Sequence, residues 1–244
     1  MLSADELFLE MLGTLGSYTR TVQDPKSPTN HETVEAEVGR SFKLEDCSDN
    51  VVRCRPVDYR WAVANVLHFF ACTESAGVLR KYNRHADRFL DGNRLDGAYG
   101  PIAVPQVVRC LELLSKQPDT RRAIVSMGPL ETESVNKPSC WSFLHFLKQG
   151  QSLHLVTYQR SLNLFGVMPY DCILLTNILY YAASTLGLPM GTLYWTIGSL
   201  HTAAEKLETV EGPKSRSMLL PIEILSDPNE CYKILEKDRL ERVL

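Results

Sequence analysis

The sequence predicts one domain that mixes helices and strands, and three observations lead to this expectation. The chain has 244 residues, of which 44% are hydrophobic and 23% charged, the ordinary range for a globular domain. Residues 57–82 and 104–117 place apolar side chains at the spacing of a helix face. Residues 141–160 have the apolar pattern and central turn of a β-hairpin. We find no repeat or linker, so a single domain over residues 1–244 is expected.

Composition narrows the classes of function. A formal charge of −3 gives no basis for a nucleic-acid or membrane partner, so an anion site must come from local arginines. No run of about 18 apolar residues is present, and the N-terminus lacks the order of a signal peptide. The seven cysteines include no C-x-x-C pair, which argues against a disulfide framework or a metal site. Reduced thiols favour a cytoplasmic protein.

The first part of the chain alternates helix, strand and loop signals. They predict a helix at 4–20, a loop at 23–37, a strand at 38–44, a helix at 57–82, a loop at 83–97 and a turn at 97–101. Arg40, taken alone, is a solvated cation at a strand edge. His68, flanked by aromatic residues, is expected to be a hydrogen-bonded core histidine. Tyr99 lies between two glycines, where backbone can approach a ligand closely.

The second part predicts more strand. Its signals indicate a helix at 104–117, a strand near 123–126, a hairpin at 141–160 buried on both faces, a helix at 171–186, a strand at 193–197, a helix at 198–210, and a strand and terminal helix within 219–244. Arg121 and Arg122 reach one anion only if the backbone bends. His145, five residues after Cys140, faces away on an extended strand, which disfavours a Cys–His dyad. Asp171, taken alone, would cap the helix that follows it.

The richest stretch runs from residue 138 to residue 171. It contains a thiol at Cys140, a cation beside a hydroxyl at Arg160 and Ser161, and a carboxylate at Asp171. A nucleophile, an anion clamp and a group that reads the base are what an enzyme acting on a nucleotide ring needs.

Four motifs together resemble the thymidylate synthase family, including its deoxycytidylate hydroxymethylase branch. They are D-T-R-R-A-I at 119–124, P-S-C at 138–140, Y-Q-R-S at 158–161 with G-x-x-P-x-D at 166–171, and W-T-I-G-S-L-H at 195–201. They come in the family's order at close to its spacing. The resemblance implies an α+β fold with a large mixed β-sheet flanked by helices, and a homodimer packed sheet on sheet.

The resemblance also implies a reaction. A one-carbon unit would pass from 5,10-methylenetetrahydrofolate to C5 of a pyrimidine nucleoside monophosphate. Cys140 would attack C6, and Tyr99 would assist removal of the C5 proton through water. Asn65 stands where the family has a proton-relaying glutamate. Asn163 replaces a folate-binding aspartate and, with Gly166, would lie at the folate site.

Substrate-binding roles carry over from the same motifs. Arg160 and Ser161 would hold the 5′-phosphate, Gln159 would help position the thiol and the phosphate, and His201 would reach the sugar hydroxyl. The other phosphate ligands would be Arg40 from the same subunit and Arg121 and Arg122 from the partner. Planar, bidentate guanidinium groups suit a phosphate in a partly dry site, and their charge favours the thiolate.

Asp171 indicates the base. Synthases that act on uracil have asparagine there, whereas the hydroxymethylases that act on cytosine have aspartate. An ionised carboxylate only accepts hydrogen bonds, so it repels O4 of uracil and suits the exocyclic amine of cytosine. The wrong base would leave buried groups unpaired, which costs orders of magnitude in specificity. The Gly-Ser-Leu-His stretch at 198–201 also resembles the hydroxymethylase branch.

The leading hypothesis is therefore a CMP or dCMP 5-hydroxymethylase, in which water captures an exocyclic methylene. Hydride capture would instead make a C5-methyltransferase of the thymidylate synthase type, and Asn65 with Asn163 motivates a third alternative, a nucleotide-binding homologue without catalysis. Ala203 replaces a tyrosine and makes room for a 2′-hydroxyl, which leaves the sugar open. Tryptophans expected within 83–98 are absent, and the chain ends in E-R-V-L rather than in the synthase tail.

Overall fold

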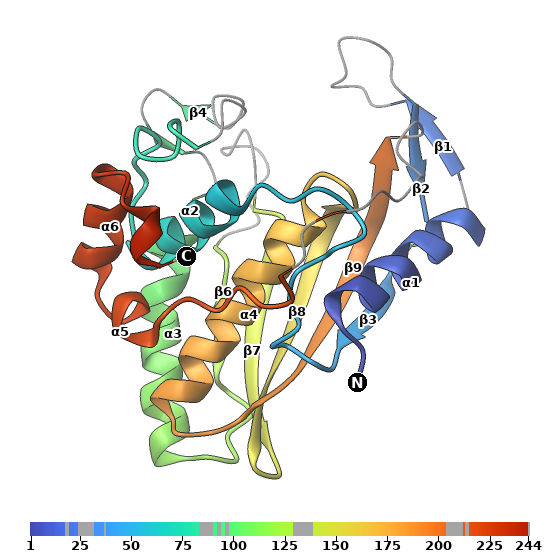
Figure 1. Cartoon of the computed structure of the whole chain (residues 1–244). Coiled ribbons are helices and arrows are strands. Elements are labelled where there is room, and N and C mark those ends of the chain that lie inside the picture. The colour runs from blue at the N-terminus through green and yellow to red at the C-terminus, as the bar shows by residue number, and fades with distance from the viewer. Residues whose placement is uncertain are drawn as a thin grey trace.

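The helices and strands of the protein are drawn in Figure 1, from a computed structural model that describes residues 1–17, 20–23, 32–36, 38–82, 90–91, 94–95, 98–128, 139–203, 212 and 215–243. The helices are α1 (Ala4–Ser17), α2 (Tyr59–Phe70), α3 (Tyr99–Lys116), α4 (Met168–Thr185), α5 (Ile222–Leu225), α6 (Pro228–Glu236) and the 3-10 helix η3 (Leu240–Arg242). The strands are β1 (Arg20–Gln23), β2 (Glu32–Glu35), β3 (Arg40–Leu44), β4 (Leu90–Asp91), β5 (Arg94–Leu95), β6 (Ile124–Ser126), β7 (Trp141–Gln149), β8 (Ser152–Asn163) and β9 (Met190–Ala203).

One large mixed sheet organises the molecule. Its strand order is β1-β2-β9-β8-β7-β6, and β3 also pairs with β9. Strands β8 and β9 run parallel because α4 connects them as a crossover, whereas the other neighbours in the sheet are antiparallel. The expected α+β fold, a large mixed sheet flanked by helices, is confirmed.

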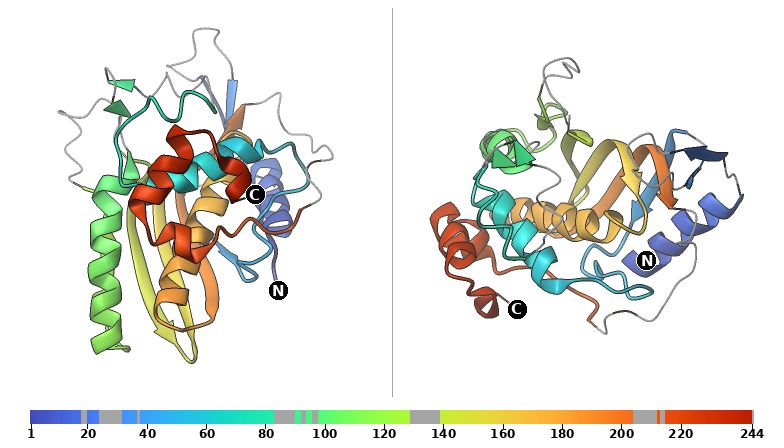
Figure 2. Two further views of the ribbon diagram at one scale, coloured as in Figure 1. Left: turned by 60° about the vertical axis from the view of Figure 1, so that its left-hand side comes forward. Right: turned by 90° about the horizontal axis from the view of Figure 1, so that it is seen from above.

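The helices lie mainly on one face of this sheet (Figure 2). Helix α4 packs on β8 and β9, α1 packs on β3 and β9, and α2 contacts α4, α3 and α6. On β8 the inward residues Leu155, Thr157 and Gln159 are fully buried, while Val156 and Tyr158 between them are partly exposed. The core therefore lies between the sheet and these helices, and the opposite face of β8 is partly exposed in the single chain.

The predicted hairpin is present as β7 and β8. Gly150 forms its turn with φ of +61°, a conformation that glycine adopts without strain. A β-bulge between Trp141 and Phe143 shifts the register, so Trp141 shares the buried face with Leu144. In the single chain the hairpin is buried on one face only, because Phe143 and Leu147 on the other face are partly buried.

Helix α2 is shorter than the helix predicted over residues 57–82. Asp58 caps its start, and Cys72, at φ of +53°, departs from the helical path just after its end. His68 is buried, and its Nε2 lies 3.2 Å from the carbonyl oxygen of Ser75. The expectation of a hydrogen-bonded core histidine is confirmed, and burial lowers the pKa of His68 to about 4.

Helix α3 starts five residues before the predicted range of 104–117. Tyr99 and Pro101 therefore belong to its first turn rather than to a free turn, and proline is tolerated there because the first N–H groups of a helix have no acceptor. Gly100 does permit a close approach, but to α2: an added Cβ would lie 2.2 Å from the carbonyl oxygen of Phe69.

The helix predicted at 198–210 is wrong for its described part. Residues 198–203 continue β9, because they pair with β8 and β2 and bring His201 opposite Asn163. Residues 204–210 lie outside the described chain. Tertiary pairing has overridden the local signal.

Helix α4 starts at Met168, three residues before the predicted start. Val167 is therefore its N-cap residue, no side chain caps it, and Asp171 lies inside the first turns. The cap interpretation of Asp171 is wrong.

The strand predicted within 219–244 is also wrong among the described residues, where α5, α6 and η3 are found. The extended segment 215–221 instead lies against buried amides. Asn50 accepts the Met218 N–H at 2.7 Å, and Asn177 on α4 accepts the Leu220 N–H at 2.8 Å.

Short strands occur within two of the predicted loops. Residues 90–91 and 94–95, inside the loop predicted at 83–97, pair as β4 and β5. Strand β1 begins before the loop predicted at 23–37, and β2 lies inside it.

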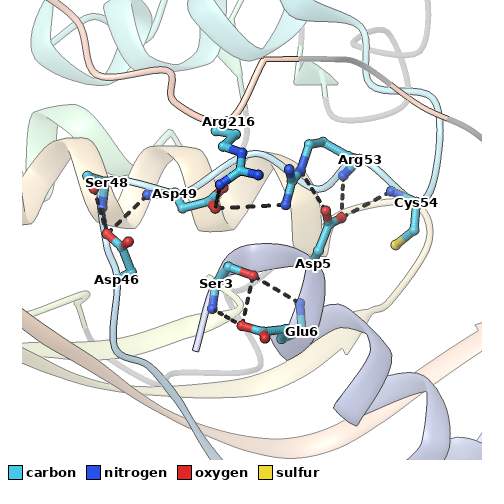
Figure 3. A network of polar contacts seen from close by, with 9 residues as sticks. All are labelled: Ser3, Asp5, Glu6, Asp46, Ser48, Asp49, Arg53, Cys54 and Arg216. Atoms are coloured by element: carbon cyan, nitrogen blue, oxygen red, sulfur yellow. Dashed lines mark hydrogen bonds and ion pairs between the residues drawn. The ribbon is translucent and has the colours of Figure 1, made fainter. Parts of the chain in front are cut away.

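A polar network fixes the N-terminal helix (Figure 3). Asp5 on α1 accepts the backbone N–H groups of Arg53 and Cys54 and pairs with the Arg53 guanidinium at 2.6 Å. Arg53 and Arg216 also lie within 4.0 Å of Asp49. These contacts tie α1 to the segment that leads into α2.

Candidate active site

Cys140 lies directly before β7, and its backbone is held from two sides. Its N–H donates to the hydroxyl of Tyr99 at 3.3 Å, and its carbonyl accepts the backbone N–H of Arg160 at 2.8 Å. The Arg160 side chain returns to the same turn, because its Nε donates to the carbonyl of Ser139 at 3.0 Å. The side chain of Cys140 is partly buried, so a thiol stands beside an arginine in a turn that has little freedom to move.

Tyr99 joins this turn to α3. Its ring is stacked on Trp141, with centroids 4.4 Å apart and planes 14° apart. Burial raises the pKa of Tyr99, and the nearby charges of Cys140 and Asp171 raise it further. The phenol is therefore neutral at physiological pH, able to donate or accept a hydrogen bond beside the thiol.

Asp171 faces the same place from α4. Its Oδ2 accepts Gln159 Nε2 at 2.8 Å and Trp141 Nε1 at 3.4 Å. Burial raises the pKa of Asp171 to about 7, although both hydrogen bonds act in the opposite direction. A carboxyl group with this pKa changes its protonation state near neutral pH, which is characteristic of functional sites.

Gln159 is fully buried on β8 and connects Asp171 to β9. Its Oε1 accepts the indole N–H of Trp195 at 3.0 Å. The two ends of the amide are thus occupied by a donor and an acceptor, which fixes its orientation.

The pairing of four strands brings Arg40 into line with these groups. Arg40 pairs with Ile197, Ile197 with Gln159, and Gln159 with Trp141. Directly paired residues share a face of a sheet, so the partly buried Arg40 lies on the face of Gln159, two strands away. Among the described strands β3 pairs only with β9, so Arg40 does lie at an edge of the sheet, but its side chain is partly buried rather than fully solvated.

The comparison with known families agrees with this geometry. A family model described as Thymidylate synthase matches residues 20–226. The chain belongs to the thymidylate synthase family. Enzymes of this family transfer a one-carbon unit from methylenetetrahydrofolate to a pyrimidine nucleotide, and they are typically dimeric. In the part of the chain that the structure describes, no helix has the length and apolar character to cross a membrane.

Arg121 and Arg122 lie away from Cys140 within one chain of this thymidylate synthase fold. Both are exposed just before β6, and Arg122 donates to Gln117 Oε1 at 2.7 Å. The carbonyl of Arg121 lies 3.1 Å from Nε2 of His145, five residues along β7 from Cys140, which is roughly 16 Å of strand. The argument against a Cys–His dyad assumed regular alternation along the strand, and the bulge breaks that alternation. The His145 ring nevertheless points to Arg121, whose carbonyl it contacts.

Ser161, Asn163 and His201 gather where β8 and β9 end. Ser161 pairs with Ser199, and Asn163 pairs with His201. The side-chain oxygen of Asn163 accepts the Gly166 N–H at 2.6 Å. The single oxygen of this side chain, which is predicted to lie at the folate site, is therefore bound within its own loop.

Asn65 lies on α2, one turn before Phe69. It is partly buried, and Phe69 is where α2 touches α3. Asn65 therefore lies on the helix side of the sheet, near the start of α3. A catalytic role for Asn65 stays a prediction.

Two site residues were missed by the sequence reasoning, namely Trp141 and Trp195. Trp195 was quoted only as part of a motif, and Trp141 only as part of an apolar pattern. The available signal was chemical, since a buried indole needs an acceptor for its N–H. The bulge that turns Trp141 inward leaves no such mark in the sequence.

Proposed function

We propose that this enzyme hydroxymethylates C5 of a cytosine nucleotide, CMP or dCMP, with 5,10-methylenetetrahydrofolate as the one-carbon donor. The observation that carries the proposal is the carboxylate of Asp171. It lies close to Tyr99, whose hydroxyl contacts Cys140, and it stands at the position where the family resemblance locates the residue that reads the base. One of its oxygens accepts hydrogen bonds from two protein donors.

The base follows from hydrogen-bond chemistry. The remaining oxygen of an ionised Asp171 accepts a hydrogen bond from the exocyclic amine of cytosine, whereas O4 of uracil offers a second acceptor and repels it. In a partly buried site an unpaired acceptor is costly, so this one group separates the two bases.

The proposed chemistry starts at sulfur. The Cys140 thiolate forms a bond to C6, and the C5–C6 electron pair moves to C5, which then bonds to the one-carbon unit. Tyr99, a neutral phenol beside the thiol, holds the water that takes the C5 proton. The electron pair left at C5 by that proton forms the double bond of an exocyclic methylene as the bond between the one-carbon unit and the folate nitrogen breaks, so tetrahydrofolate is the leaving group. Water then adds to this methylene, the C5–C6 double bond forms again, and the C6–S electron pair returns to sulfur, which frees Cys140 and the product.

The methylene of the folate supplies carbon at the oxidation level of formaldehyde, so addition of water needs no external reductant. The described residues provide polar groups for such a co-substrate at Asn163 and Gly166, whose loop follows the Arg160–Ser161 pair. With the Asn163 oxygen bound to Gly166, its Nδ2 is the group available to a heterocycle.

The phosphate would be held by arginines that are separated within one chain. Arg160 and Ser161 act from their own subunit, joined by Arg40 from the same row. Arg121 and Arg122 would come from the partner subunit, since roughly 16 Å of strand separates them from Cys140.

A homodimer packed sheet on sheet is supported by the face of the sheet opposite α4. One row of this face runs across Ile124, His145, Val156 and Tyr194, in which Ile124 is 48% and Tyr194 40% exposed. Exposed apolar side chains on a wide sheet are typical of an interface. The Arg121–His145 contact is at the margin of this face.

Mass analysis of the product tests the proposal. CMP, dCMP, UMP and dUMP are each incubated with the enzyme and methylenetetrahydrofolate, and tritium release from C5 is followed in parallel. We expect a gain of CH2O on a cytosine nucleotide, and the comparison of CMP with dCMP identifies the sugar. A gain on uracil nucleotides alone would contradict the proposal.

One observation favours a second candidate, a C5-methyltransferase of the thymidylate synthase type. With a pKa near 7, Asp171 is partly protonated at neutral pH and can donate to O4 of uracil. A gain of CH2 on UMP or dUMP would select this function.

A further inference from the structure

The carboxylate of Asp171 is held asymmetrically. Gln159 Nε2 and Trp141 Nε1 both donate to Oδ2, at 2.8 and 3.4 Å. The other oxygen, Oδ1, is the one that neither donor occupies. Two N–H groups that donate to the same position require an oxygen there. The two terminal atoms of an aspartate or asparagine side chain at 171 are therefore not equivalent, because one of them must be an oxygen that faces these donors.

This asymmetry depends on a residue one shell further away. An indole N–H only donates, so the end of Gln159 that faces Trp195 must be its oxygen, at 3.0 Å. The NH2 end of the same amide must then face Asp171. Trp195 and Gln159 are both fully buried. A flipped Gln159 amide would place its NH2 group against the indole N–H of Trp195 and its oxygen against the carboxylate oxygen of Asp171, with no water to compensate.

We propose that Trp141 and Trp195 are positioning residues that determine which atom of residue 171 meets the base, and thereby the choice between cytosine and uracil. The inference rests on the proposed function, because it gives residue 171 the role of reading the base. Trp195 acts through Gln159, and Trp141 acts directly.

The arrangement explains how one substitution can exchange one base for the other. With aspartate at 171, the free atom is Oδ1, an acceptor that suits the cytosine amine. With asparagine, the oxygen must occupy the position between the two donors, and the NH2 group turns to the ligand and suits O4 of uracil. Without the donors, an asparagine could present either end and would discriminate poorly.

Trp195→Phe is the decisive variant, because it removes one N–H group and keeps an aromatic ring in the core. Phe42→Leu is the matched control, since Phe42 is the direct cross-strand neighbour of Trp195 and carries no hydrogen-bonding group. Gln159→Glu is a second variant that leaves both indoles in place. It sets two carboxyl groups against each other, and it keeps the test valid if Trp195→Phe fails to fold.

Two readouts separate this inference from the proposed function. Calorimetry gives the Kd for UMP divided by the Kd for CMP in each variant, a ratio that lies above one when cytosine is preferred. Infrared spectroscopy follows the C=O band of protonated Asp171 against pH without any nucleotide, with the band assigned by its loss in Asp171→Asn.

We expect Trp195→Phe and Gln159→Glu to reduce the Kd ratio by about tenfold, the effect of one hydrogen bond, and to move the Asp171 titration to higher pH. Phe42→Leu should change neither. If the titration moves while the wild type shows no preference for cytosine, the positioning role stands and the proposed function fails. If the wild type prefers cytosine but neither variant differs from Phe42→Leu in ratio or titration, the positioning role is overturned and the proposed function stands.

Discussion

Helix α4 carries two polar residues, Asn177 and Asp171, that use their hydrogen-bonding groups differently. Asn177 is fully buried, and both ends of its amide bind backbone: Oδ1 accepts the Leu220 N–H, and Nδ2 donates to the carbonyls of Ile173 and Met218. Asp171, six residues earlier on the same helix, receives two donors on one oxygen. Its partners are the side chains of Gln159 on β8 and Trp141 on β7 rather than backbone.

The difference separates a structural contact from a reactive one. An amide whose donor and acceptor capacity is used by backbone holds the 215–221 segment and has nothing left for a ligand. A carboxyl group with one oxygen left over, and with a pKa raised to about 7 by burial, retains both binding capacity and a change of charge near neutral pH. The same helix therefore supports the fold near its middle and the proposed chemistry near its start.

The largest test removes the nucleophile beside Asp171. Cys140→Ala should lower turnover by about 10³-fold or more, because the covalent bond to C6 cannot form. Nucleotide binding should persist, since the arginines and Asp171 are unchanged. C5 tritium release measures the loss, and Cys54→Ala, a partly buried thiol on another segment, is the matched control. Undiminished release in Cys140→Ala would remove the proposed mechanism.

The second test changes Asp171 itself. Asp171→Asn should move the preference, measured as the ratio of kcat/KM values, from cytosine towards uracil nucleotides by roughly 10²-fold or more. Melting should change little, because this side chain does not cap α4. Asp227→Asn, which alters the carboxylate that caps α6, should leave the ratio unchanged. An unaltered preference would reduce Asp171 to a structural residue like Asn177.

The third test changes the saturated amide. Asn177→Ala leaves the buried Leu220 N–H without its acceptor and removes one of the two amide donors to the Met218 carbonyl, and should lower the free energy of unfolding by about 2–3 kcal/mol. At this chain length that corresponds to a fall in Tm of about 5–10 °C. The base preference should not move. Thermal unfolding measures the loss of stability, with Asn229→Ala at an exposed position as the control. A change in base preference in Asn177→Ala would contradict the assignment of Asn177 to a purely structural role.

The smallest effect is a dependence on pH. Because burial raises the pKa of Asp171 to about 7, the acceptor form grows as pH rises, and the ratio of kcat/KM for cytosine over uracil should increase about tenfold between about pH 6 and 8. Tyr99, whose pKa is raised, stays protonated there. Ionisation of Cys140 affects both bases and cancels in the ratio. We expect the kcat/KM ratio to rise with pH in the wild type and to be independent of pH in Asp171→Asn. A ratio that is independent of pH in both proteins would contradict the role of Asp171 in reading the base.

Much of the fold was predictable where local patterns are strong. The hairpin, β3 and the core role of His68 follow from alternation, turn residues and apolar neighbours, which act over a few residues. The continuation of β9 through His201 was not predictable, because it depends on pairing with β8 and β2. The same is true of the early start of α3, where Gly100 meets the backbone of Phe69.

Sequence motifs alone predict the order and chemistry of the site residues, including the thiol at Cys140, the arginines and the carboxylate of Asp171. These follow from motifs whose residue types and spacing are local information. The packing of the folded chain, in contrast, places Asp171 against Gln159 and Trp141 rather than at the cap of α4, and places Trp195 where it orients the Gln159 amide. The reason is physical: a hydrogen bond between side chains on α4, β7, β8 and β9 depends on the packing of helix on sheet and on one bulge, and neither is encoded within any single segment.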